Sequence, residues 1–103
     1  MARSLIKPRA DRDVFELFEH FLDHSERSAD SFADSFAAVI RRLEEHPKSG
    51  QVHPLLGGDI RVAHVNRYKA TLYYVYTVED DGPLVSVLRV LRQERDVSGA
   101  DFE

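Results

Sequence analysis

Two histidines spaced one helical turn apart are the first candidates for chemistry in this sequence. His20 and His24 are four residues apart, with Asp23 between them, and on a helix this spacing puts both imidazole rings on one face, where they could bind zinc. No third ligand is evident, and Glu16 and Glu19 make the same helix polar, so a solvated helix face is the favoured interpretation. The chain also has no cysteine, which excludes thiolate sites and disulfides. We therefore predict neither a metal ion nor another cofactor.

A second group of side chains could act on a phosphodiester. Arg61 and Arg89 could neutralise a phosphate, and Tyr73 or His64 could move a proton. No histidine or tyrosine follows Tyr76, however, so a general acid and a general base are poorly supplied. A net charge of −4 also disfavours binding to RNA, because phosphate neutralisation supplies most of that affinity. Ribonuclease activity is therefore the less favoured hypothesis, and we expect no direct contact with nucleic acid.

A single small domain is expected to position these side chains. The chain has 103 residues, of which 43% are hydrophobic and 31% charged, which is typical of one globular domain over residues 1–103. No apolar run approaches the roughly 20 residues of a membrane span, and the N-terminus lacks a secretory signal, so we expect a cytoplasmic protein. Residues 1–12 carry four basic and one acidic side chain, whereas residues 13–46 carry three basic and nine acidic ones. This asymmetry predicts an acidic layer and a basic surface.

The first half of the chain is predicted to form a helical hairpin. A short edge strand over residues 5–7 ends at Pro8. Apolar residues then recur at helical spacing in two segments, for which Asp11 and Ser28 are the expected N-caps, and the second segment stops at Pro47. The expected apolar stripes are Val14, Phe15, Leu17, Phe18, Phe21 and Leu22 in the first segment, and Phe32, Ala33, Phe36, Ala37, Ile40 and Leu43 in the second.

The second half predicts three antiparallel strands. They cover residues 60–65, 69–78 and 84–92, and an Asp-Gly step in the loop between the last two favours a hairpin. The expected fold is α+β, with two layers and the order β-α-α-β-β-β. In this fold the helical hairpin packs on one face of a small antiparallel sheet.

One face of that sheet is expected to remain open, because two helices cover only one side. Alternation along the middle strand directs Ala70, Leu72, Tyr74, Tyr76 and Val78 toward the helices. His64 is also expected on the helix side, whereas Arg89 is costly to bury and is placed outside. The expected open face comprises Ala63, Val65, Tyr73, Val75, Val87 and Leu91, together with Arg61, Lys69 and Arg89. Such a patch is typical of a partner surface, with a homodimer contact or a cover by the C-terminal tail as alternatives.

Short patterns lie in a fixed order along nearly the whole chain. After the second helix come Leu43 and Pro47-Lys48-Ser49-Gly50, then Arg61, Val65-Asn66-Arg67-Tyr68, Leu72-Tyr73-Tyr74-Val75-Tyr76, Val87-Leu88-Arg89-Val90-Leu91 and Arg95-Asp96. In this order and spacing they resemble the RelE/ParE superfamily, whose members are toxins of bacterial type II toxin–antitoxin modules. The closing segment resembles the ParE branch most, although that branch usually has a histidine where this chain has Arg92.

The resemblance implies a toxin that a cognate antitoxin holds inactive. ParE-like members are linked to inhibition of DNA gyrase and cleave no known bond, whereas RelE-like members cut messenger RNA on the ribosome. A third hypothesis is an orphan member that binds a partner without being toxic. Cations around an apolar groove would suit an acidic, partly disordered antitoxin segment. The candidate residues for binding the antitoxin or the target are Arg61, Lys69, Tyr73, Val75, Val87, Arg89, Leu91, Arg92 and Arg95.

Overall fold

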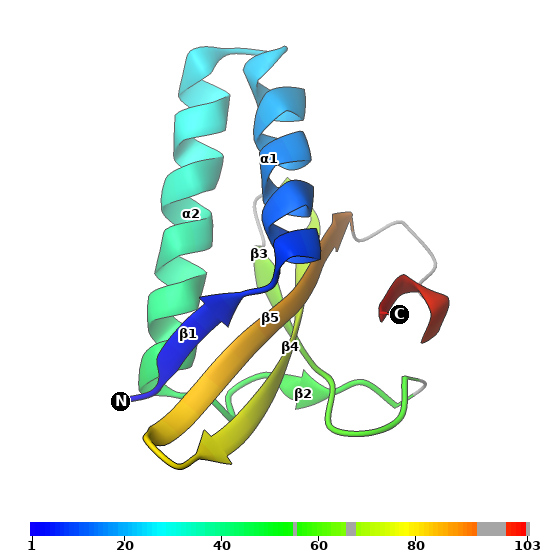
Figure 1. Cartoon of the computed structure of the whole chain (residues 1–103). Coiled ribbons are helices and arrows are strands. Elements are labelled where there is room, and N and C mark those ends of the chain that lie inside the picture. Colours follow the sequence, from blue (N-terminus) through cyan, green and yellow to red (C-terminus); the bar gives the residue numbers. More distant parts are fainter. Residues whose placement is uncertain (55, 66–67, 93–98, 103) are drawn as a thin grey trace.

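The computed structural model describes residues 1–54, 56–65, 68–92 and 99–102, in which two helices pack on a five-stranded sheet (Figure 1). The elements are β1 (Arg3–Ile6), α1 (Pro8–Leu22), α2 (Glu26–Glu45), β2 (Gln51–Val52), β3 (Arg61–Val65), β4 (Ala70–Glu79), β5 (Gly82–Arg92) and the 3-10 helix η2 (Gly99–Phe102). The strand order is β1-β5-β4-β3-β2, with β1 parallel to β5 and the other pairs antiparallel. The expected α+β fold is confirmed, with the two-residue β2 as an addition. No helix in the described ranges is long and apolar enough to cross a membrane.

The first strand, β1, pairs with β5, which lies about 80 residues later in the sequence. It lies beside β5, with Arg3 opposite Leu84 and Ile6 opposite Val87. The N–H of Lys7 still donates to the carbonyl oxygen of Val87 at 3.0 Å, and the chain then leaves the sheet to start α1. The part of β5 that follows Val87 is therefore flanked by β4 on one side only.

Both helices begin earlier than the sequence analysis expected. α1 starts at Pro8, whose missing N–H is no loss at a first helical position. Asp11, the expected cap, lies in the first turn, and Lys7 precedes the helix without a side-chain cap. α2 is capped by Ser25, whose Oγ accepts the backbone N–H of Ser28 at 3.0 Å. The assignments of Asp11 and Ser28 as caps were therefore wrong.

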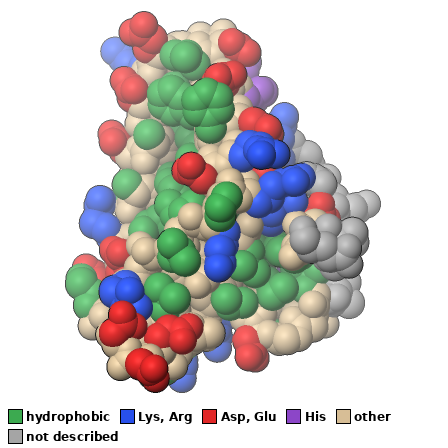
Figure 2. All heavy atoms as spheres, viewed as in Figure 1, with side chains coloured by type: hydrophobic (Ala, Val, Ile, Leu, Met, Phe, Trp, Pro, Cys, Tyr) green, Lys and Arg blue, Asp and Glu red, His purple; other side chains and the backbone are tan. Residues whose placement is uncertain are grey.

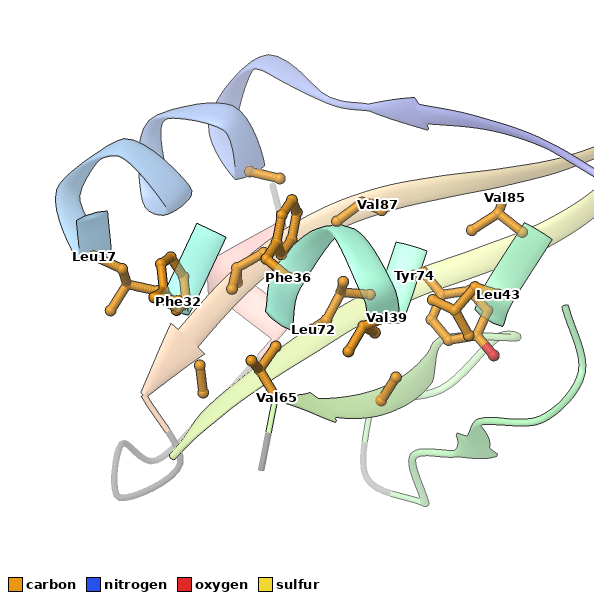
Figure 3. Close-up of a cluster of buried hydrophobic side chains, with 14 of the residues drawn as sticks. Leu17, Phe32, Phe36, Val39, Leu43, Val65, Leu72, Tyr74, Val85 and Val87 are labelled. Atoms are coloured by element: carbon orange, nitrogen blue, oxygen red, sulfur yellow. The ribbon is translucent and has the colours of Figure 1, made fainter. Parts of the chain in front are cut away.

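The core lies between the helical hairpin and the sheet (Figure 3). The buried residues of α2 are Ala29, Phe32, Phe36, Val39 and Leu43, which recur every three or four positions. Ala33 and Ala37, which the expected stripe included, are exposed on an adjacent face. On α1, Phe15 and Leu22 were also expected in the stripe but are 61% and 43% exposed. Each apolar stripe is narrower than expected, and Phe15 lies outside the core.

A β-bulge in β5 reverses the alternation of side chains along that strand. Tyr74 pairs with Val87 and Tyr73 pairs with Arg89, so Leu88 has no partner of its own in β4. Before the bulge Val87 is fully buried in the core, and beyond it Arg89 lies on the opposite face with Tyr73. Placing Val87 on the open face was therefore wrong, because simple alternation does not anticipate an inserted residue.

Strand β3 also presents the face opposite to the one expected. Ala63 and Val65 pair with helix-facing residues of β4 and are buried in the core. His64 was expected on the helix side but is exposed, with its Nδ1 3.2 Å from Thr71 Oγ1. The faces of β3 were assigned by placing the charged Arg61 outside. Arg61 is the first residue of the strand, however, and its side chain reaches carbonyl oxygens of the preceding loop.

Tyr74 joins the sheet to the loop that follows α2. Its hydroxyl donates to the carbonyl oxygen of Pro47 at 2.8 Å and accepts the N–H of Gly50 at 3.0 Å. A Cβ at Gly50 would lie 2.6 Å from this hydroxyl and 2.4 Å from the carbonyl oxygen of Val62, so the close approach requires glycine. Burial raises the pKa of Tyr74 above its ordinary value of 10.0, and outweighs the opposing effects of the Gly50 N–H and the charge of Arg61.

Replacing Tyr74 by phenylalanine is expected to lower the free energy of unfolding by about 1–3 kcal/mol, because a buried amide and carbonyl lose their partner. In the wild type, the unfolded tyrosine ionises above pH 10, whereas folded Tyr74 stays protonated because its pKa is raised. Ionisation therefore stabilises the unfolded state, and the free energy of unfolding falls as the pH rises beyond that value. Tyr74→Phe should lack this pH-dependent loss. Urea unfolding at pH 7 and at alkaline pH measures both effects, and an unchanged stability at pH 7 would contradict the hydrogen bonds.

Candidate functional site

The first half of α1 lies against the part of β5 that β1 does not cover. There the carboxylate of Asp13 takes the place of a neighbouring strand and accepts the backbone N–H of Val90 at 3.0 Å. The same carboxylate accepts Nε of Arg89 at 2.6 Å and Nη2 at 3.0 Å. The side chains of Asp13 and Arg89 are only 7% and 6% exposed. Helix and strand are thus joined by a buried, bidentate ion pair.

The surroundings of Arg89 hold it in the charged form. The hydrogen bonds to Asp13 raise the pKa of Arg89 above its ordinary value, although burial acts in the opposite direction. The negative charges of Asp13, Asp101 and Glu16 raise it further. Arg89 is therefore a charged partner for Asp13 in the folded protein.

Arg89 also contacts the C-terminal 3-10 helix η2. Its Nη1 donates to the carbonyl oxygen of Asp101 at 2.8 Å, and the Asp101 carboxylate lies 3.9 Å away. Phe102 packs edge-on against Tyr73, with 5.3 Å between the ring centroids. Tyr73 and Arg89 are only 6% and 5% exposed. This part of the expected open face is therefore covered by the chain itself, which is one of the alternatives that the sequence left open.

A groove of about 610 Å³ runs between α1 and the end of β5. Its lining residues are Arg9, Arg12, Asp13, Glu16, Leu17, His20, Arg89, Val90, Leu91 and Arg92. Leu17, Val90 and Leu91 are buried apolar residues, whereas Arg9, Arg12 and Arg92 are exposed. The groove thus combines an apolar floor with a cationic rim.

A second, more apolar groove lies along α1 itself and has a volume of about 540 Å³. Its lining residues are Pro8, Asp11, Arg12, Val14, Phe15 and Phe18. Arg12 lines both grooves and therefore separates them. The first half of α1 thus presents an apolar groove and a cationic groove side by side.

Several of the sequence-derived binding candidates lie away from this site. Arg61 donates to two carbonyl oxygens of the loop after α2, at 3.2 and 2.7 Å. Lys69 is exposed in the turn before β4 and has a φ of 51°, and Val75 is half-buried within β4. Val87 is fully buried in the core, so it does not join Val75 and Leu91 on the open face, contrary to the expectation from the sequence. Arg95 lies outside the described residues.

The other candidates lie near α1. Tyr73 and Arg89 contact η2, while Leu91 and Arg92 line the groove between α1 and β5. Leu91 is 4% exposed and contributes to the groove floor, and Arg92 is exposed at the end of the strand. Of the nine candidates, Arg89, Leu91 and Arg92 therefore share one groove.

Of the residues considered for phosphodiester chemistry, Tyr73 and Arg89 are cross-strand partners, whereas Arg61 is separate from them. Arg61 pairs with Tyr74, in the register that faces the helices, whereas Arg89 pairs with Tyr73 in the opposite register. The guanidinium of Arg89 is bound to Asp13 and to η2. The two arginines that could have neutralised one phosphate therefore lie in opposite registers of the sheet.

The histidine pair on α1 is solvent-exposed. The rings of His20 and His24 meet edge to face with their centroids 5.4 Å apart. Within residues 1–54, 56–65, 68–92 and 99–102, no group of three histidine, cysteine, aspartate or glutamate side chains is placed to hold a metal ion.

Sequence reasoning missed the contribution of α1 to this site. Asp13 lies between Ala10 and Leu17 on the buried side of the helix, and an acidic residue at such a position indicates a buried partner. That signal was present in the sequence. Arg9 and Arg12 gave no comparable signal, because exposed arginines are common on helices.

Comparison with known proteins gives one family and one fold. A family model described as the ParE toxin of the type II toxin–antitoxin system, parDE, matches residues 5–97. No curated protein matches the chain. The fold is similar to a structure of the chromosomal ParDE toxin–antitoxin system from P. aeruginosa, with a TM-score of 0.74 and 16% identity over 91% of this chain and 98% of the other. Because the family model covers most of its length, the chain belongs to the ParE toxin family of type II toxin–antitoxin systems.

Proposed function

We propose that this toxin inhibits DNA gyrase in the cytoplasm by binding it, without cleaving a bond, and that an acidic segment of the cognate antitoxin neutralises it. Membership of the ParE family supports the antitoxin partner. The observation that carries the non-enzymatic mechanism is the ion pair of Arg89. A guanidinium held by Asp13 and 5% exposed is poorly placed to stabilise charge on a phosphate.

Two further candidates for catalysis support the same choice. Arg61 holds the loop after α2, and Tyr73 packs against Phe102. The net charge of −4 also works against binding to ribosomal RNA. Cleavage of messenger RNA in the manner of RelE, and an orphan that binds without toxicity, are the two competing functions.

Two assays on the purified toxin test this proposal. We expect inhibition of gyrase supercoiling, no ribosome-dependent cleavage of messenger RNA, and DNA damage in cells that produce the toxin without antitoxin. Tyr73→Phe is an informative variant, because it keeps the ring against Phe102 and removes only the hydroxyl. If Tyr73 moved a proton in a nuclease, the variant would lose roughly 100-fold or more in cleavage rate.

The outcomes separate the three functions. Codon-phased cleavage that Tyr73→Phe abolishes, with supercoiling untouched, would overturn the gyrase proposal and favour an interferase. Inhibited supercoiling that Tyr73→Phe leaves nearly unchanged would support it. Activity in neither assay, together with harmless production in cells, would favour the orphan.

A further inference from the structure

The first half of α1 carries exposed side chains that neither the fold nor the proposed gyrase inhibition explains. They lie on both sides of Arg12, in the apolar groove along α1 and in the cationic groove between α1 and β5. In Figure 2 a cluster of hydrophobic side chains and a cluster of Lys and Arg side chains lie near each other on this face of the molecule. The two grooves therefore present one continuous surface of mixed chemistry.

The apolar groove centres on Phe15. This side chain is 61% exposed, and the buried side of α1 is already filled by Ala10 and Leu17. Much of the free energy that full burial of a phenylalanine contributes is therefore unrealised here. Val14 and Phe18, which are half-buried beside it, extend the apolar surface. A partner that covers Phe15 would gain this burial without disturbing the core.

The cationic groove is positive although the protein as a whole is negative. Four arginines and two carboxylates line it, and one of these carboxylates is neutralised within the pair of Asp13 and Arg89. Among the described residues, neither Arg9 nor Arg12 forms an ion pair. Guanidinium groups bind carboxylates through two parallel hydrogen bonds. This groove therefore suits an acidic partner.

We propose that the first half of α1, from Pro8 to Phe18, is the docking surface for a segment of the antitoxin in which apolar and acidic residues are neighbours. The segment lies across Arg12, with an apolar side chain beside Phe15 and carboxylates beside Arg9, Arg12 and Arg92. This inference rests on the proposed neutralisation by an acidic antitoxin segment, and it locates that segment on α1 rather than on the sheet face.

The chemistry of the two grooves together favours a peptide over a nucleic acid or a second copy of this chain. A nucleic acid would meet the cationic groove but would leave Phe15 and Phe18 uncovered, and the net charge of −4 would repel it. A second copy of this chain would bring its own arginines toward Arg9 and Arg12. An acidic and apolar segment satisfies both grooves, and charge complementarity of this kind also speeds association.

The test is calorimetry with the full-length toxin and a synthetic peptide of the acidic C-terminal segment of the antitoxin encoded beside it. Phe15→Ala and Arg12→Glu are each expected to raise the dissociation constant about tenfold or more. Arg12→Glu should also weaken the dependence of affinity on salt. Both side chains are exposed, so thermal unfolding should be nearly unchanged.

Matched controls come from exposed side chains elsewhere. Val78 is 73% exposed and is the control for Phe15, while Arg41 on α2 is exposed and is the control for Arg12. Val78→Ala and Arg41→Glu should bind the peptide like the wild type.

Three outcomes would overturn the inference. If the wild type binds and Phe15→Ala and Arg12→Glu bind equally well, the antitoxin segment docks elsewhere and the proposed function stands. If Phe15→Ala dissociates a homodimer while peptide affinity is unchanged, the occupant is a second copy. If the wild type binds the full antitoxin but not its acidic peptide, the proposed neutralisation by an acidic segment is wrong, and this inference is wrong with it.

Discussion

Replacing Asp13 by alanine is expected to lower the free energy of unfolding by about 3–5 kcal/mol, because it leaves the buried charge of Arg89 without its partner. The backbone N–H of Val90 also loses its acceptor. The loss should be visible as a large shift in the urea midpoint at pH 7. Asp11→Ala is the matched control, because Asp11 is exposed in the first turn of the same helix.

A double variant separates the unpaired charge from the loss of packing. Replacing Asp13 and Arg89 together by leucine removes both charges, and the double variant should be more stable than Asp13→Ala. If Asp13→Ala loses less than about 1 kcal/mol, the ion pair is not buried in solution, and the assignment of Arg89 to a structural role is wrong.

Truncating Phe36 to alanine is expected to cost about 3–5 kcal/mol, because the side chain is 8% exposed and stacks on Phe32 with 6.4 Å between the ring centroids. The cavity would open between α2 and the sheet, where the surrounding residues can relax only in part. Denaturant unfolding measures the loss directly, and the slope with denaturant should stay that of the wild type.

Phe15→Ala is the control for this second change. Its side chain is 61% exposed, so the same truncation should cost less than about 1 kcal/mol. Equal losses for the two variants would mean that the faces of the helical hairpin are rotated relative to the sheet. A small loss for Phe36→Ala alone would mean that the stripe on α2 is misplaced.

The sequence predicted the layers of this fold more reliably than the faces of its strands. Periodicity identified both helices, and alternation on β4 correctly directed Leu72 and Tyr74 into the core. Alternation failed on β5, because Leu88 is inserted into the pairing with β4. It failed on β3 because the faces were assigned from Arg61, at the end of the strand, rather than from the apolar Ala63 and Val65. An inserted residue leaves little trace in composition, whereas the second error came from giving one charge too much weight.

The candidate site was predicted only in part. Arg89, Leu91 and Arg92 were singled out as binding candidates, and they line one groove. The apolar groove along α1 was missed, because Phe15 fits an apolar helical stripe by spacing alone. Only the packing of α1 against β5 shows that this phenylalanine faces away from the core. Helical periodicity gives the width of an apolar face poorly when neighbouring positions are also apolar.

The parallel pairing of β1 with β5 has a consequence for synthesis on the ribosome. Residues 3–6 are made about 80 residues before their partners, residues 84–87. Translation at about 5–20 residues per second takes roughly 4–16 s to cover that separation. During that time the helical hairpin can form, but the sheet against which it packs cannot close. Any activity that needs the finished sheet is therefore absent from the nascent chain and begins only after the last strand has emerged.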